Sequence, residues 1–171
     1  MTARPSLENF IRIRIIRFRM NSSTAVPARV VCRGTVHVPL PPDRALRLFT
    51  PRGERDWAEG WAPVFPAEDA DDTAPGTVFV THADDGGQAI WMVAHRGERA
   101  MRYARAIPGR WAGTVDVRCE PAGAGTAAEV TYDLTALDPA QRPRLQEFAA
   151  GYAAFLREWE REIAAALGRP C

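Results

Sequence analysis

The chain has 171 residues, 46% of them hydrophobic and 25% charged, with 22 Lys+Arg against 21 Asp+Glu. This length and balance are typical of one folded domain, and they exclude a disordered chain, a collagen and a disulfide scaffold. All 22 basic residues are arginine, which also excludes a lysine Schiff base, a lysine nucleophile and a P-loop. Serine occurs only at Ser6, Ser22 and Ser23, outside the predicted domain, which excludes serine hydrolysis.

Arginine is concentrated at the N-terminus. Residues 1–19 contain five Arg and one acid, so the rest of the chain carries 17 Arg against 20 acids, a net charge of −3. Since this acidic body lacks a broad basic face, we expect no nucleic-acid partner for the domain. Residues 10–19 alternate apolar residues with Arg and a polar stretch follows. We interpret residues 1–27 as a flexible Arg-rich extension, with a membrane or nucleic-acid tether, or an added edge strand, as alternatives.

The three cysteines form no C-x-x-C pair and no Cys/His cluster at metal spacing. Cys32 and Cys119 lie in apolar runs, where we expect them to be buried, reduced thiols of a cytoplasmic protein, while Cys171 is the last residue. No run of about 18 apolar residues occurs, so we expect no stable membrane insertion. We expect neither a metal nor a cofactor.

The first half of the body predicts one strand and two short helices. Residues 28–38 are rich in β-branched side chains and are followed by Pro39, which indicates a strand. In residues 40–51 two prolines precede an Asp cap and an apolar stripe that Pro51 closes, which predicts a short helix. Residues 52–61 predict a second short helix. Residues 62–74 predict a Pro- and Asp-rich loop. We interpret the acids at 69–72 as solvated, with weak attraction of calcium as the alternative.

From residue 75 the chain predicts an antiparallel meander followed by a helix. Short turns rich in Gly, Pro and Asp separate five β-rich runs. In the last run Ala128, Val130, Tyr132 and Leu134 share one face, which marks a sheet with one wet face. The inward parity of Trp91 stays open, because its run is apolar on both faces. The five runs are residues 76–82, 88–95, 99–107, 110–120 and 126–136.

Residues 139–167 carry apolar residues at steps of three and four over about seven turns, which predicts a long amphipathic helix. Consecutive strands without crossover helices exclude a parallel βαβ architecture. We therefore predict a single α+β domain over residues 28–168, in which a curved antiparallel sheet of about six strands wraps around the long C-terminal helix. Because one helix cannot fill a curved sheet, we expect an apolar pocket, closed at one end by the two short helices.

This order resembles the helix-grip fold of the START-related superfamily, often called SRPBCC. The segment VHVPLPPDRALRLFTPRGERDWAEGWAP (residues 36–63) is similar to the first strand and helix pair of bacterial members. PGTVF (75–79) and TYDLTAL (131–137) resemble their second and last strands. The likeness covers about residues 28–167. It implies polyketide cyclase-like or lipid-binding relatives, but the superfamily shares its fold across binding and catalytic roles.

Aromatic side chains gather at the positions that this fold places around its pocket. Ordinary core packing accounts for about half of them, and we expect the others to line a ligand site. The hydroxyls of Tyr103 and Tyr152 and the indole N–H groups are the predicted polar anchors. The candidate ligand-binding residues are Trp57, Trp61, Phe79, Trp91, Met101, Tyr103, Phe148, Tyr152 and Phe155, with Trp159 in the same aromatic group.

The titratable side chains leave the catalytic residues unassigned. His37, His82 and His95 lie at predicted strand ends or turns, where we expect them to be exposed or hydrogen-bonded. A general acid/base role for His82 or His95 at the pocket mouth is the alternative. Arg102 and Arg105 lie on opposite faces of one strand. One of them therefore faces inward, where it needs an acid of the fold or an anionic ligand group.

Our leading hypothesis is binding of a hydrophobic small molecule, such as a lipid, a polyketide or an aromatic metabolite, between sheet and helix. The first alternative is a cofactor-free cyclase, aromatase or dehydratase acting in the same pocket. The second is a protein-interaction module like the heat-shock ATPase activators. A monomer and a homodimer are both left open.

Overall fold

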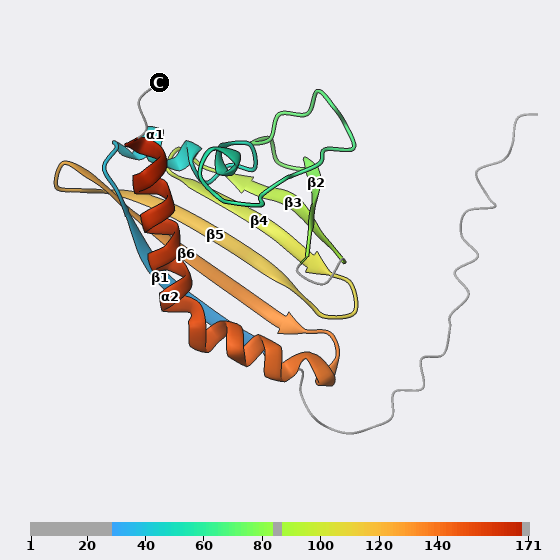
Figure 1. The fold of residues 1–171 in the computed structure, drawn as a ribbon. Helices are drawn as coiled ribbons and strands as arrows, with labels where there is room; N and C mark the ends of the chain where they lie inside the picture. The colour runs from blue at the N-terminus through green and yellow to red at the C-terminus, as the bar shows by residue number, and fades with distance from the viewer. Residues whose placement is uncertain (1–28, 84–86, 169–171) are drawn as a thin grey trace, which may run out of the picture.

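The computed structural model describes residues 29–83 and 87–168, so the predicted N-terminal extension lies outside the described residues. Figure 1 shows a curved sheet with one long helix across it and a group of short helices at one end. In chain order the elements are β1 (Arg29–Val38), α1 (Pro42–Arg47), η2 (Gly53–Asp56), β2 (Val78–His82), β3 (Gln88–Arg96), β4 (Ala100–Ile107), β5 (Trp111–Ala122), β6 (Gly125–Ala136), η3 (Pro139–Gln141) and α2 (Arg142–Leu167).

The sheet is antiparallel throughout, in the order β1-β6-β5-β4-β3-β2. The predicted α+β helix-grip fold, with about six strands and a long C-terminal helix, is confirmed. The first strand lies beside the last, so that Cys32 is opposite Tyr132, and Tyr132 is opposite Val115 on its other side. This row of neighbours forms the floor of the sheet's concave face.

Alternation along the strands decides which side chains face α2. Burial alternates residue by residue along β6, as predicted from its sequence. In β3 the open question of parity is settled, because Trp91 is buried while Ile90 and Met92 are exposed on the outer face. The concave face is therefore apolar and rich in aromatic rings.

The second short helix is smaller than predicted. Only Gly53–Asp56 form a 3-10 turn, and the chain then loops to Trp61. A Cβ atom on Gly53 would overlap the carbonyl of Arg47, so the turn depends on a close backbone approach that only glycine permits. This segment is therefore an irregular loop with one 3-10 turn, not a regular helix.

The apolar stripe of α2 packs against the sheet, mainly along β1. Leu145, Tyr152, Leu156 and Ile163 are buried. A Cβ atom on Gly34 of β1 would lie 2.5 Å from Leu156 Cδ1, so this glycine lets the helix approach the strand. The aromatic members of the stripe, Phe148, Phe155 and Trp159, stay partly exposed. No helix in residues 29–83 and 87–168 is long and apolar enough to cross a membrane.

Candidate functional site

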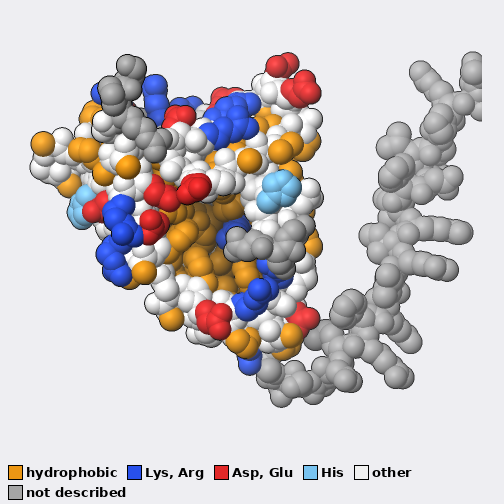
Figure 2. All heavy atoms as spheres, viewed as in Figure 1, with side chains coloured by type: hydrophobic (Ala, Val, Ile, Leu, Met, Phe, Trp, Pro, Cys, Tyr) orange, Lys and Arg blue, Asp and Glu red, His pale blue; other side chains and the backbone are white. Residues whose placement is uncertain are grey.

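A cavity of about 610 Å³ lies between the concave face of the sheet, α2 and the segment around η2. Figure 2 shows it as a hollow with a hydrophobic floor, acidic side chains along part of its rim and a basic side chain inside. Its volume is within the usual range for small-molecule sites. The pocket predicted from the curvature of the sheet is therefore present in the described residues.

Nine of the 23 residues that line the cavity are Trp, Phe or Tyr. Phe79 stacks on Trp91 at a centroid distance of 5.7 Å with an interplanar angle of 7°, and Trp61 meets Trp91 edge-on at 5.7 Å. Six candidate residues line the cavity: Trp61, Phe79, Trp91, Tyr103, Phe148 and Phe155. Trp159 also lines it, as do two aromatic residues absent from the candidate set, Trp111 and Tyr132.

The other three candidate residues, Trp57, Met101 and Tyr152, lie in the hydrophobic core and not on the cavity wall. Trp57 packs edge-on against Trp159 and donates its indole hydrogen to the Leu48 carbonyl at 2.7 Å. Tyr152 is a buried residue of α2 itself, and its side chain points into the core toward β6. For Met101, the alternation of side chains along β4 predicts an inward direction correctly. It does not tell whether another element covers that position.

The polar anchors predicted for a ligand are already bonded within the protein. The hydroxyl of Tyr103 donates to the Phe49 carbonyl at 2.9 Å, and that of Tyr152 donates to the Val130 carbonyl at 2.8 Å. The indole of Trp61 donates to the Pro51 carbonyl, and that of Trp91 donates to the Thr81 hydroxyl. These hydrogen bonds fix the positions of the four rings. Their O–H and N–H groups already donate to protein acceptors.

Arg105 is the inward-facing arginine of β4. It lines the cavity, and its guanidinium carbon lies 4.7 Å from the centroid of the Trp91 ring, a cation–π contact. Arg102 points outward and its Nε donates to Asp116 Oδ1 at 2.6 Å. The prediction that one of these two arginines faces inward is thus confirmed.

Glu54, at the second position of η2, is half-buried and lines the same cavity. Burial raises the pKa of its carboxyl well above the usual range, and the nearby positive charge of Arg105 opposes that shift only in part. Burial also raises the pKa of Tyr103 and of Tyr132, and the Glu54 charge adds to both shifts. The centre of the cavity therefore favours neutral side chains around one guanidinium.

Acidic side chains border the cavity mouth. Glu59, Glu158 and Glu162 line the cavity, and His82 lines it as well. Partial burial raises the pKa of Glu162, and the charges of Glu158 and Glu59 raise it further. His37 and His95 do not line the cavity. Across the described part of the chain, no group of three His, Cys, Asp or Glu side chains is placed to hold a metal ion.

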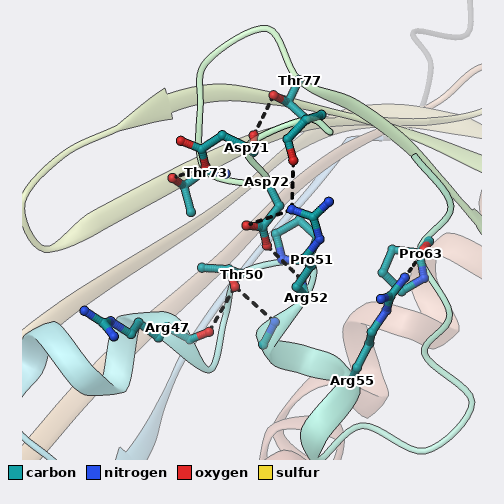
Figure 3. A network of polar contacts seen from close by, with 12 residues as sticks. Arg47, Thr50, Pro51, Arg52, Arg55, Pro63, Asp71, Asp72, Thr73 and Thr77 are labelled. Carbon is teal, nitrogen blue, oxygen red and sulfur yellow. Dashed lines mark hydrogen bonds and ion pairs between the residues drawn. The ribbon is translucent and has the colours of Figure 1, made fainter. Parts of the chain in front are cut away.

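One side of the cavity is closed by Pro51, Glu54 and residues 58–61. They belong to the cap segment, which we define as residues 51–77. Figure 3 shows how it is fastened. The backbone N–H of Arg52 donates to Asp72 Oδ2 at 2.9 Å, and its guanidinium donates to the Ala70 carbonyl at 2.8 Å. Arg55 donates to the Pro63 carbonyl at 2.6 Å. The prediction that the acids of this loop are only solvated is wrong for Asp72, which closes the loop onto η2.

Cys32 and Cys119 are free, buried thiols, as predicted. Burial raises the pKa of both, and that of Cys119 reaches about 11. Thiolate is the reactive form of cysteine, so neither residue is equipped as a nucleophile. The chemically useful groups of the site are instead Glu54, Arg105, Tyr132 and the carboxylates at the mouth.

Comparisons with known proteins agree with this architecture. A family model described as polyketide cyclase / dehydrase and lipid transport matches residues 29–167. No curated protein matches the chain. Among solved structures, protein MLL2253 from Mesorhizobium loti has 20% identity and a TM-score of 0.57, over 81% of this chain and 98% of that one.

Two further solved structures come from proteins with more informative names. Norcoclaurine synthase from Thalictrum flavum has 10% identity and a TM-score of 0.59, over 84% of this chain and 90% of its own. DynU16, from the dynemicin biosynthetic locus, has 20% identity and a TM-score of 0.55, over 77% of this chain and 46% of its own. At such identities the likeness shows the fold alone.

Proposed function

The chain belongs, over residues 29–167, to the polyketide cyclase / dehydrase and lipid transport family, and we propose that it binds an apolar, largely aromatic small molecule in its cavity. The resemblance to the START-related superfamily is thereby confirmed. The observation that carries the proposal is the cavity of about 610 Å³ with aromatic rings around it. Such walls favour flat, apolar ligands, which they contact through stacked and edge-on rings.

The candidate contacts of this ligand are the six predicted residues on the wall, Trp61, Phe79, Trp91, Tyr103, Phe148 and Phe155, together with Trp111, Tyr132 and Trp159. The buried free thiols Cys32 and Cys119 support a reducing compartment, and we include a cytoplasmic location in the proposal. No cofactor is part of it.

A thermal-shift screen tests the proposal with two classes of probe, saturated fatty acids and planar polycyclic aromatics. A ligand at 100 times its dissociation constant stabilises the folded state by about 2.7 kcal/mol. For a chain of this size, that raises the melting temperature by about 5–10 °C. We expect aromatics to give the larger shift. Fatty acids alone giving a shift would contradict the aromatic preference, and no shift with either class would contradict the proposal.

A second candidate function is a cyclase or dehydratase, and the observation that favours it is the half-buried carboxyl of Glu54 in the cavity. A carboxyl with a raised pKa keeps its proton to higher pH than an ordinary carboxyl does, as a general acid requires. In an aldol cyclisation, an enol carbon bonds to a ketone carbon, and the resulting hydroxyl then leaves with a neighbouring hydrogen as water. Glu54→Gln would abolish turnover of a poly-β-ketone thioester while keeping its affinity; unchanged turnover would exclude Glu54 as the acid.

A further inference from the structure

The hydroxyl of Tyr132 differs from those of the other two tyrosines. Those of Tyr103 and Tyr152 each donate to a backbone carbonyl. Tyr132 lines the cavity and is only 5% exposed, yet its hydroxyl has no hydrogen-bond partner within residues 29–83 and 87–168. This hydroxyl is not among the fully buried polar atoms and is open to the cavity, where a bound molecule can reach it. The group is therefore one that a bound molecule would satisfy.

The ring of Tyr132 is held firmly from the helix side. Its centroid lies 5.4 Å from that of Phe148, 5.9 Å from that of Tyr152 and 6.3 Å from that of Phe155, all on α2. Its backbone is in the ladder between β1 and β5. The hydroxyl thus occupies a set position in the cavity wall before any ligand arrives, which favours directional recognition.

The indole N–H of Trp111 on the wall is also without a hydrogen-bond partner among the described residues, and Glu54 is a further polar group of the wall. Its side chain makes no hydrogen bond and no ion pair with any described residue, although it is half-buried. Glu54 and Tyr132 line the same cavity. Burial raises the pKa of the Glu54 carboxyl, and burial together with the Glu54 charge raises the pKa of the Tyr132 phenol. Since both groups favour the neutral, protonated form, both can donate a hydrogen bond.

The surrounding charges select the kind of acceptor. Arg105, stacked on Trp91, gives the centre of the cavity a positive potential that attracts an oxygen with partial negative charge. At the mouth, Glu59, Glu158 and Glu162 repel anions such as fatty-acid carboxylates. A neutral molecule with a polarised oxygen fits both regions.

We propose that the hydroxyl of Tyr132 and the carboxyl of Glu54 together bind one carbonyl oxygen of a neutral aromatic ligand. This inference rests on the proposed function, because it names the chemical class that the same cavity takes. A carbonyl oxygen has two lone pairs and can accept from both donors at once. The site therefore distinguishes an aromatic ketone from a hydrocarbon of the same shape.

Two planar probes isolate this contribution. The acetyl and isopropenyl derivatives of anthracene, substituted at the same ring position, differ only in a C=O that replaces a C=CH2. Their dissociation constants are measured by quenching of tryptophan fluorescence, with isothermal titration as a check. We expect the wild-type protein to prefer the ketone about 3- to 10-fold, the range that hydrogen bonds to neutral groups provide.

Tyr132→Phe should bring the two dissociation constants close to equality while leaving that of the hydrocarbon unchanged. Tyr152→Phe is the matched control: it removes a tyrosine hydroxyl outside the cavity wall, and it should keep the preference for the ketone. Glu54→Gln keeps an N–H donor and should retain most of the preference, whereas Glu54→Leu should reduce it.

Three outcomes would count against the inference. Equal binding of both probes to the wild-type protein would overturn it and leave the proposed function standing, as would a Tyr132→Phe variant that keeps the full preference. Binding of neither probe would overturn the aromatic ligand of the proposed function and the inference with it. Circular dichroism of each variant shows that the fold is retained.

Discussion

The carboxyl of Glu54 affects the stability of the fold and also belongs to the proposed ligand site. Its carboxyl is surrounded by Arg105 and Tyr103 from β4 and Tyr132 from β6, and α2 contributes Glu158 and Glu162 to the same cavity. Because burial raises its pKa, the folded protein holds this proton more tightly than the unfolded chain does. The stability that this provides is complete below the unfolded carboxyl pKa and is lost as pH rises through the folded one.

The Glu54→Gln substitution is therefore expected to help more as pH rises. Glutamine is neutral at every pH, so the variant avoids burying a charge where the wild-type residue ionises. Urea unfolding of both proteins at pH 4.5 and pH 8 gives the two differences in free energy of unfolding. The gain of the variant over the wild type should be larger at pH 8. A gain that is the same at both pH values would contradict a raised pKa at Glu54.

For single residues, the sequence predicts whether a side chain on a strand faces inward or outward. It does not predict the hydrogen-bond partner of that side chain. The inward direction of Tyr132 follows from the alternation of its strand. The Tyr103 hydroxyl reaches the Phe49 carbonyl, whereas the Tyr132 hydroxyl bonds to no described residue, and this difference depends on segments distant in sequence. Glu54 is in a short irregular turn without periodicity, so no pattern could place its carboxyl inside the cavity.

At the scale of elements, regular segments were predictable and the cap segment was not. Five β-rich runs with short turns, and apolar steps of three and four, led directly to the strands and to α2. The two-residue turn at 123–124 is tighter than expected, because β5 and β6 extend to Ala122 and Gly125. The cap segment is held by side-chain bonds between residues 18 and 20 positions apart, which leave no periodic signal.

Asp72 is expected to be the main fastening of the cap segment. Asp72→Ala removes the acceptor of the Arg52 backbone N–H and the carboxylate that lies 3.7 Å from its guanidinium. We expect the free energy of unfolding to fall by about 1–2 kcal/mol and limited proteolysis within residues 66–77 to become faster. Asp69→Ala, in the exposed part of the same loop, is the control. Equal proteolysis of both variants would show that Asp72 does not hold the cap.

At the scale of the whole molecule, the cavity leaves part of the space between sheet and helix unpacked. Protein interiors are normally packed without large voids, yet a space of about 610 Å³ remains under α2. The helix bends around its middle, where it passes over the concave face (Figure 1). Gly151 is in this part of α2 and lines the cavity, and a Cβ atom there would meet no atom within 4 Å. A glycine inside a helix lowers its stability.

We therefore expect Gly151 to lower the stability of the folded protein and to leave room for a ligand to enter the cavity. Gly151→Ala is expected to stabilise the protein by about 0.5–1 kcal/mol, which raises the melting temperature by about 1–4 °C. Gly151→Phe should block the mouth, so that the fold persists while an aromatic ligand no longer shifts the melting temperature. Scanning fluorimetry with and without ligand measures both effects, and Ala150→Phe, at an exposed neighbouring position that does not line the cavity, should keep the full ligand shift. A Gly151→Phe variant that responds to ligand like the wild type would place the entrance elsewhere.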